Sequence, residues 1–257
     1  QGALFSQNFT TATNSYNVGI GHEAGGAITT GINNTLIGGN AGDALTNAGR
    51  NTALGFATLS TDTLGNRSTA VGYAALTSQN FTTSADSNNT AVGYNAGAAT
   101  TTGIQNTLMG SDAGDALTDA DFNVAIGSFA LTGDTLGSAS TAVGRAALAA
   151  QNFTTATTSH NTAMGFNTAT QITTGISNTC IGSQAGDALT DADFNVALGK
   201  DALGADTLGS RSTAIGFQAL NTQNFTTATD SNNTAVGANA GLAVTTAIQN
   251  VLLASRA

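Results

Sequence analysis

The chain has 257 residues, only 8% of them charged, and its formal net charge at pH 7 is −9. Its six basic residues are too few for the cationic stripe that nucleic-acid binding needs, so we expect no nucleic-acid partner. No apolar run approaches the roughly 20 residues of a membrane-spanning helix. Aliphatic residues return at fixed intervals, which is atypical of a disordered chain. We therefore expect a folded, acidic repeat protein without a membrane span.

A 72-residue repeat organises the whole sequence. The tetrapeptide Gln-Asn-Phe-Thr recurs in equal steps, beginning at Gln7, Gln79, Gln151 and Gln223. A fixed long period indicates an architecture built by repeating one unit. We therefore expect one domain over residues 1–257, built from super-repeats at about 7–78, 79–150 and 151–222 and a partial one at 223–257.

A shorter pattern lies inside each super-repeat. The sequence Asn-Thr-Ala-aliphatic-Gly, here called the strand motif, recurs fourteen times, with Ala254 replacing the glycine in the last copy. Its glycines are spaced by 17, 17, 17 and then 21 before the cycle restarts, as in Gly21, Gly38, Gly55, Gly72 and Gly93. A period of 17 suits one coil with short strands and tight turns. The fold class that we predict is all-β, a parallel β-solenoid (β-roll) of about fourteen rungs in a 17/17/17/21-residue pattern.

The strand motif also predicts which side chains face the core. Its fourth place is always a large aliphatic residue, such as Ile20 or Leu198, so we predict that this face lines a dry core. Side chains alternate along a strand, so the third place points the other way. The third place is mostly alanine, with leucine at Leu36, Leu108 and Leu252, and such a face permits close approach by another surface. We expect the first-place asparagines to form a ladder and the fifth-place glycines to adopt a backbone geometry forbidden to other residues.

The fourth rung of each super-repeat is four residues longer and contains the Gln-Asn-Phe-Thr segment. Extra backbone around a bulky ring predicts a bulge or a protruding loop. Phe81, Phe153 and Phe225 are therefore candidates for lateral contact with a neighbouring strand or filament, with packing into the core as the alternative. The Asn-Phe-Thr triplets, at Asn8, Asn80, Asn152 and Asn224, also match the acceptor motif for asparagine glycosylation.

Two segments resemble a known family. Asn-Thr-Ala-Val-Gly-Tyr-Asn-Ala-Gly at 89–97 and Ser-Thr-Ala-Val-Gly-Tyr-Ala-Ala-Leu at 68–76 resemble the head repeats of trimeric autotransporter adhesins, and are similar to repeats of phage tail fibres. The resemblance extends over essentially the whole chain. It implies a left-handed parallel β-roll, commonly with three chains side by side, exposed on a cell or virion surface. It also implies attachment to a cell-surface receptor or glycan, although the sequence shows no coiled-coil stalk, membrane anchor or receptor-binding tip.

The two ends of the sequence are complementary parts of a rung. The chain begins in the second half of a rung and stops in the first half of another, and an open strand edge templates further pairing. We therefore expect subunits to join head to tail into a homopolymer; the alternative is a fragment of a longer fibre. The end residues expected in this contact are Gln1, Leu4, Phe5, Asn250, Val251, Leu252 and Leu253.

The sequence offers little catalytic chemistry. No Ser/His/Asp arrangement, phosphate loop or metal cluster repeats, so we expect no enzyme and no cofactor. Two acidic triplets are candidates for a calcium site, with carboxylates in a solvated turn as the alternative: Asp115, Asp119 and Asp121, and Asp187, Asp191 and Asp193. The resulting hypothesis is a non-enzymatic structural subunit of an extracellular fibre that assembles head to tail. The alternative is a homotrimeric surface adhesin or tail-fibre shaft.

Overall fold

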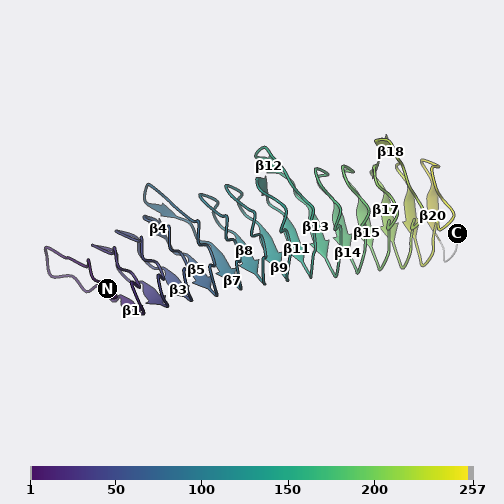
Figure 1. Cartoon of the computed structure of the whole chain (residues 1–257). Coiled ribbons are helices and arrows are strands. Elements are labelled where there is room, and N and C mark those ends of the chain that lie inside the picture. The colour runs from purple at the N-terminus through teal and green to yellow at the C-terminus, as the bar shows by residue number, and fades with distance from the viewer. Residues whose placement is uncertain (1, 254–257) are drawn as a thin grey trace. The chain divides into compact units, whose positions relative to one another are not determined.

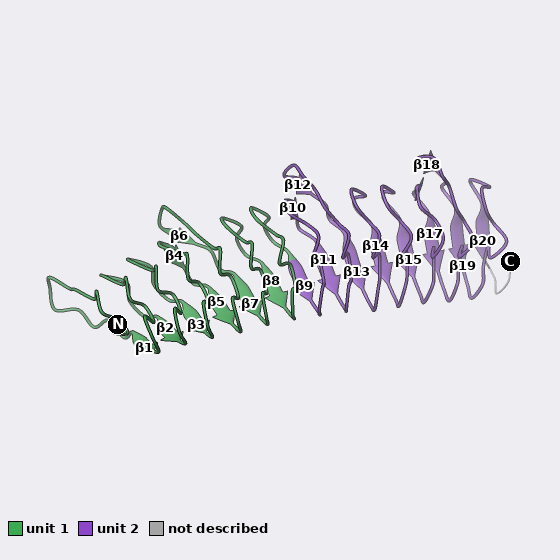
Figure 2. Cartoon of the chain, viewed as in Figure 1, with its two compact units in different colours: residues 1–123 green, residues 124–257 purple. Residues whose placement is uncertain are grey.

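The structure, a computed structural model, describes residues 2–253. It confirms the predicted fold class, an all-β parallel solenoid of about fourteen turns, and the described residues contain no helix. The chain divides into two compact units, residues 1–123 and residues 124–257, each a stack of coils (Figure 2). Each coil contributes one three-residue strand to a long parallel sheet, and this strand is the centre of the strand motif.

The long sheets pair equivalent places of successive strand motifs. In the first unit the order is β1 (Val18–Ile20), β2 (Thr35–Ile37), β3 (Thr52–Leu54), β5 (Thr69–Val71), β7 (Thr90–Val92) and β8 (Thr107–Met109). In the second unit it is β9 (Val124–Ile126), β11 (Thr141–Val143), β13 (Thr162–Met164), β14 (Thr179–Ile181), β15 (Val196–Leu198), β17 (Thr213–Ile215), β19 (Thr234–Val236) and β20 (Val251–Leu253). Ala53 pairs with Ala70, and Leu54 with Val71, so the repeats stack without slippage.

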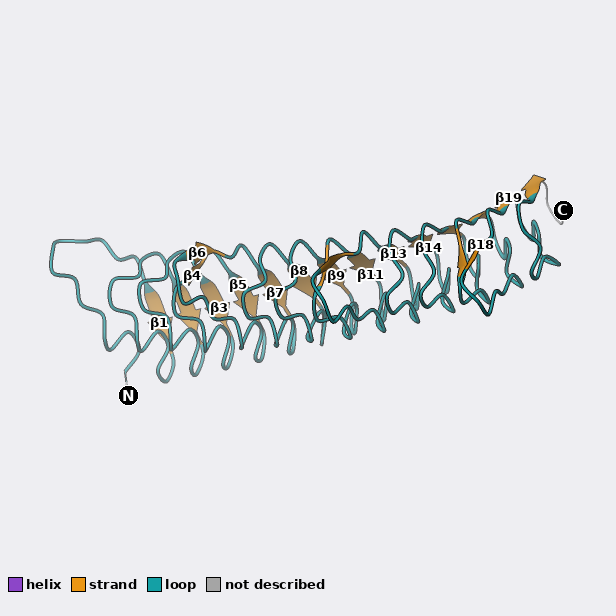
Figure 3. Ribbon diagram, turned by 90° about the horizontal axis from the view of Figure 1, so that it is seen from above, coloured by secondary structure: helices purple, strands orange, loops and turns teal. Residues whose placement is uncertain are grey.

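The lengthened rungs form additional two-stranded parallel sheets. These pairs are β4 (Gly65–Asn66) with β6 (Ala85–Asp86), β10 (Gly137–Ser138) with β12 (Thr157–Thr158), and β16 (Gly209–Ser210) with β18 (Thr229–Asp230). Figure 1 shows the loops at β12 and β18 projecting beyond neighbouring coils of their unit, as the four extra residues predict. Figure 3, seen from above, shows the long-sheet strands following one another within each unit.

The core lies on the opposite face of the strands from the one predicted. Third-place residues such as Ala53 and Ala197 are fully buried, whereas the fourth-place Leu54 and Leu198 are 44% and 41% exposed. The prediction that the fourth place lines the core is therefore wrong, and the alanine face is not available for another surface. The physical reason is that leucines in the turns, such as Leu59, enter the coil and fill the space above the small strand residues.

Strand and turn residues share the core volume between them. The fourth residue after each motif glycine has a left-handed backbone and is either leucine or glycine in most coils. Leu36 lies between Gly25 and Gly42, where an added Cβ would come within 2.7 Å and 2.9 Å of the Leu36 side chain. A leucine in the strand therefore requires glycine in the adjoining turns, which keeps the interior densely packed.

From Ile28 to Gln223, the seventh residue after each motif glycine lies in a line of buried side chains, which we call the core column. Over the four coils that follow Gly21, Gly38, Gly55 and Gly72, the core column reads Ile28, Leu45, Asp62 and Gln79, all fully buried. The same order of two apolar residues, aspartate and glutamine returns in the next super-repeat, except that Thr100 replaces isoleucine. The 72-residue period is therefore a property of the interior as well as of the protruding loops.

Thr100 provides a direct test of the core column. Its Oγ1 is buried and has no hydrogen-bond partner, while Ile28 and Ile172 occupy the equivalent places. We expect Thr100→Val to raise the free energy of unfolding by about 1–2 kcal/mol, because the change removes an unsatisfied buried hydroxyl. Urea denaturation measures the difference, with Thr101→Val as the exposed control. A destabilised Thr100→Val variant would contradict this account of the column.

The predicted asparagine ladder is confirmed. Asn34 is fully buried, and its Nδ2 donates to the Ala48 carbonyl oxygen at 2.9 Å. Its Oδ1 accepts from the Asn51 backbone N–H at 3.0 Å, and Asn51 repeats both contacts one coil further on. Each buried amide therefore links neighbouring coils and satisfies backbone groups that water cannot reach.

Candidate functional site

In each unit the outward side of the long sheet, here called the outer sheet face, exposes large apolar side chains. It comprises the second- and fourth-place residues of the strand motif and the residue after the glycine, and none of the second- and fourth-place residues is charged. Its exposed large apolar members in the two units include the following residues, which are 37% to 54% exposed: Val18, Leu54, Phe56, Tyr73, Tyr94, Met109, Ile126, Met164, Phe166, Leu198, Phe217 and Val236. Half-buried threonines of the second place lie beside them. Each unit thus presents a nearly uncharged, largely apolar surface.

Aromatic rings form the rim of this face in the first unit. Phe56, Tyr73 and Tyr94 follow the glycine in successive coils, so the register stacks their rings. The ring centroids lie 5.6 Å apart for Phe56 and Tyr73, and 5.3 Å apart for Tyr73 and Tyr94. Such pairs stabilise by roughly 0.5–1.5 kcal/mol beyond their buried area. The rings are about half exposed, so they also extend the apolar surface sideways.

In the second unit, cations cover rings at the rim. The Arg145 guanidinium lies 5.6 Å from the centroid of the Phe166 ring, and the Lys200 ammonium lies 5.9 Å from that of Phe217. Arg211 lies over Phe194 at 5.4 Å and also pairs with the Asp230 carboxylate at 3.0 Å. Arg145 and Lys200 thus hold their positive charges at the rim after the glycine, whereas Arg211 and Phe194 immediately precede the strand motifs.

The three phenylalanines predicted as lateral contacts are buried. Phe81, Phe153 and Phe225 are only 7%, 5% and 6% exposed, so the core-packing alternative holds. Their rings turn inward beneath the two-stranded sheets, and a Cβ at Gly137 would lie 2.7 Å from the Phe153 ring. The lateral-contact interpretation is therefore wrong, because the extra backbone folds the ring into the coil.

The predicted end residues are partly exposed. Phe5, Val251 and Leu253 are exposed, and Leu4 and Leu252 are half-buried. The Asn250 backbone N–H donates to Asn233 Oδ1 at 2.9 Å and so continues the asparagine ladder. Gln1 lies outside the described residues. The expected contact between the N-terminal residues of one copy and the C-terminal residues of another stays a prediction.

Four carboxylates of the acidic triplets accept hydrogen bonds from the preceding coil. Asp119 accepts from the Thr102 hydroxyl at 2.6 Å, and Asp121 accepts from the Ile104 backbone N–H at 2.8 Å. Asp191 and Asp193 make the equivalent contacts one super-repeat later. Over residues 2–253, no group of three or more His, Cys, Asp or Glu side chains is arranged to hold a metal ion. The calcium possibility therefore gains no support from this geometry.

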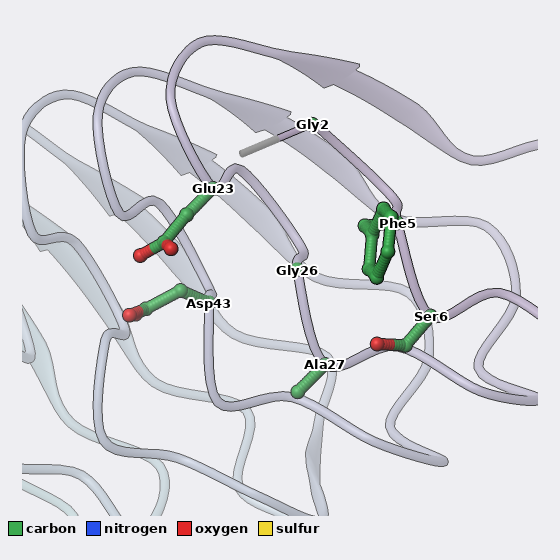
Figure 4. A pocket seen from close by; sticks show the side chains of 7 residues that line it. All are labelled: Gly2, Phe5, Ser6, Glu23, Gly26, Ala27 and Asp43. Atoms are coloured by element: carbon green, nitrogen blue, oxygen red, sulfur yellow. The ribbon is translucent and has the colours of Figure 1, made fainter.

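A shallow pocket of about 290 Å³ lies near the start of the described chain, lined by Gly2, Phe5, Ser6, Glu23, Gly26, Ala27 and Asp43 (Figure 4). Figure 4 shows the carboxylates of Glu23 and Asp43 pointing the same way from neighbouring coils. Burial raises the pKa of Asp43, and the nearby negative charge of Glu23 raises it further. The pocket thus contains two acids and the Ser6 hydroxyl, and none of its lining residues is basic.

A buried polar network occupies the third and fourth places of the core column. Gln223 Nε2 donates to Asp206 Oδ2 at 2.5 Å and to Ser212 Oγ at 3.0 Å. Asn233 Nδ2 donates to Gln223 Oε1 at 2.8 Å, and Ser212 bonds Ser231. All five side chains are fully buried. The same contacts recur in the preceding super-repeat, which makes the network a regular part of the architecture.

This network supplies hydrogen bonds where the asparagine ladder is interrupted. The fourth strand motif begins with serine, whose side chain lacks an amide, so Gln223 reaches into the gap beside Ser212. Sequence reasoning missed it, although the 72-residue spacing of Asp62, Asp134 and Asp206 was a usable signal. The polar atoms are used in holding neighbouring coils together, so the network has a structural role.

Cys180 is also part of the interior. It stands where most other coils have alanine, it is 1% exposed, and burial raises the pKa of its thiol to about 12. A buried, protonated thiol is a poor nucleophile at neutral pH.

The candidate site is therefore the outer sheet face of each unit. Within the described chain no helix is long and apolar enough to cross a bilayer. No protein-family model matches the sequence, and no curated protein matches it.

Proposed function

We propose that the chain is a non-enzymatic structural subunit of an extracellular fibre, and that its copies associate side by side through the outer sheet face. The single observation that carries the proposal is the nearly uncharged, largely apolar surface of the long sheet in both units. Extended exposed apolar patches on soluble proteins mark interaction surfaces.

The composition of the face favours a second copy as its partner. The aliphatic and threonine rows carry no charge, so two copies can meet without repulsion or a complementary charged patch. Each square ångström of apolar surface removed from water contributes roughly 25 cal/mol. Fourth-place residues such as Leu198 still expose about two fifths of their surface, which leaves area for association to bury.

The trimeric alternative uses the same face. Three copies side by side cannot meet through third-place alanines, because these are buried within each coil. They can meet through the outer sheet face, and the resemblance to trimeric adhesin heads supports this arrangement. A surface adhesin or tail-fibre shaft that attaches to a host receptor or glycan would then be the biological context.

End-to-end joining remains the second candidate mode of assembly. Leu252 in β20 is half-buried, whereas the equivalent Leu36 and Leu108 are fully buried. The outer edge of β20 therefore has apolar surface that a strand of another copy would cover. Lateral and end-to-end assembly differ in particle shape, so negative-stain images of the native protein separate them.

Charge substitutions on the outer sheet face test the lateral mode. We expect Met164→Lys combined with Leu198→Lys to reduce the mass in sedimentation velocity to that of one 25.2 kDa chain. The free energy of unfolding should change by less than about 1 kcal/mol, because both side chains are already substantially exposed. Ala156→Lys is the control, since it adds a charge at an exposed loop position outside the face.

The outcomes separate the two assembly modes. An unchanged native mass in the double variant, with long filaments in images, rejects lateral association and favours joining through strand edges. A wild-type protein that sediments as a single chain at micromolar concentration argues against both modes.

A further inference from the structure

The chain contains eight matches to the Asn-x-Ser/Thr acceptor motif, and the fold distinguishes among them. They begin at Asn8, Asn33, Asn66, Asn80, Asn88, Asn152, Asn224 and Asn232. Modification attaches a sugar to the side-chain Nδ2, so an acceptor needs that nitrogen accessible and unengaged. Four of the matches are the Asn-Phe-Thr triplets of the 72-residue period.

In three of the remaining four matches the Nδ2 atom is engaged, and the fourth, at exposed Asn33, runs directly into a strand. Asn66 Nδ2 donates to Ser84 Oγ and the Ala85 carbonyl oxygen, both at 3.2 Å. Asn88 and Asn232 donate Nδ2 to carbonyl oxygens two residues earlier, at 3.0 Å each. The motif at Asn33 ends on Thr35, a half-buried strand residue, as those at Asn88 and Asn232 end on strand threonines.

The Asn-Phe-Thr asparagines have the opposite geometry. Asn152 Oδ1 accepts from the Thr135 hydroxyl at 3.2 Å, and the Asn152 backbone N–H donates to the Thr173 carbonyl oxygen at 3.0 Å. Asn224 is held in the same way, with a 3.1 Å bond from Thr207. Both side chains are exposed, and among the described residues neither Nδ2 donates a hydrogen bond. The amide oxygen is therefore anchored and the amide nitrogen is left to solvent.

The following residues present the rest of the motif outward. Phe153 is buried, while Asn152 and Thr154 on either side of it are exposed. They lie where the chain enters the projecting loop before β12 (Figure 1). The buried ring thus fixes the backbone, and the two polar residues of the motif remain on the outside of the coil.

We propose that Asn152 and Asn224, together with the half-buried Asn80, accept asparagine-linked sugars, so that glycans mark these lengthened rungs at intervals of 72 residues. The co-reactant is a sugar activated as a diphosphate ester and delivered by a glycosyltransferase. Nδ2 attacks the anomeric carbon, and a C–N bond forms as the C–O bond to phosphate breaks. The diphosphate leaves with the bonding electron pair, and one amide proton passes to solvent. These residues lie outside the outer sheet face. A result that rejects glycosylation therefore does not reject the proposed assembly, and the reverse also holds.

Transfer to the folded, full-length chain tests the inference. The purified protein is incubated with a soluble asparagine glycosyltransferase and a nucleotide-activated hexose, and the products are mapped by peptide mass spectrometry. We expect hexose on Asn152 and Asn224, with at least severalfold lower occupancy at Asn80. Asn66, Asn88 and Asn232 should remain unmodified.

Matched variants separate acceptor recognition from a general structural effect. Thr154→Ala should abolish transfer to Asn152 while leaving Asn224 modified, and the neighbouring Thr155→Ala should leave both modified. Absence of hexose from Asn152 and Asn224, while the same enzyme modifies a short Asn-Phe-Thr peptide, overturns the inference. Equal occupancy at Asn66, Asn88 and Asn232 overturns it as well, because the fold would then make no distinction.

Discussion

Replacing Asp206 with alanine is expected to lower the free energy of unfolding by roughly 3–6 kcal/mol. Asp206 Oδ1 accepts from the backbone N–H groups of Gly209 and Phe225 at 3.0 Å each, and its Oδ2 accepts from Gln223 Nε2. Asp206→Ala leaves these three buried donors without an acceptor, and each lost partner costs about 1–3 kcal/mol. The loss should also disturb Ser212, which shares Gln223 with the carboxyl group.

Chemical denaturation followed by circular dichroism measures this effect. Asp191→Ala is the matched control, because Asp191 is exposed and accepts one hydroxyl hydrogen bond, so its loss should cost less than about 1 kcal/mol. Asp206→Asn should be intermediate, since it keeps one acceptor oxygen but turns an N–H toward the Gln223 amide. Equal stability of Asp206→Ala and Asp191→Ala would show that the network contributes little.

Gly144→Ala should destabilise the fold by on the order of 3 kcal/mol or more. Gly144 has a φ of +131°, where an L side chain is strained, and an added Cβ would lie 2.2 Å from the Gly165 carbonyl oxygen. The atom that the new Cβ would meet belongs to the backbone, so it cannot move aside as the end of a flexible side chain could. Relief requires β11 and β13 to separate, and these strands are paired in parallel through Thr141–Thr162, Ala142–Ala163 and Val143–Met164.

Gly39→Ala is the control for the positive φ and the backbone contact at Gly144. Gly39 lies outside the positive-φ region, and its added Cβ would meet only the edge of the Phe56 ring at 3.3 Å. We expect its unfolding free energy to stay within about 0.5 kcal/mol of the wild type. If thermal melts show equal losses for the two alanine variants, the cost comes from glycine-to-alanine exchange in general rather than from contact between coils.

Periodicity alone predicted the architecture. The regular spacing of the strand motifs specifies the number of coils, and the register pairs Thr with Thr and Ala with Ala, as at Thr52–Thr69 and Ala53–Ala70. The asparagine ladder followed from the same repetition, because equivalent residues of successive coils must lie above one another. These features depend on the spacing of equivalent residues, which can be read directly from the sequence.

The side of the strand that faces inward could not be predicted in the same way. Both faces of the motif are apolar, so alternation at Ala197 and Leu198 shows two faces without identifying the inner one. The choice depends on Leu203, a turn residue that fills the interior from outside the strand. The contact between Asp206 and Gln223 was equally hidden, since it joins different residue types from two coils.

The core column restricts how the length of such a chain can change during evolution. Deleting the single coil that carries Asp206 would leave Gln223 without its acceptor. Deleting a whole super-repeat would instead place another aspartate of the core column in the coil before a glutamine, so the hydrogen bond between them is kept. Recombination between near-identical super-repeats removes or duplicates complete copies of this unit and keeps the interior matched. Natural variants of this chain should therefore differ in length by whole super-repeats, with single-coil insertions selected against.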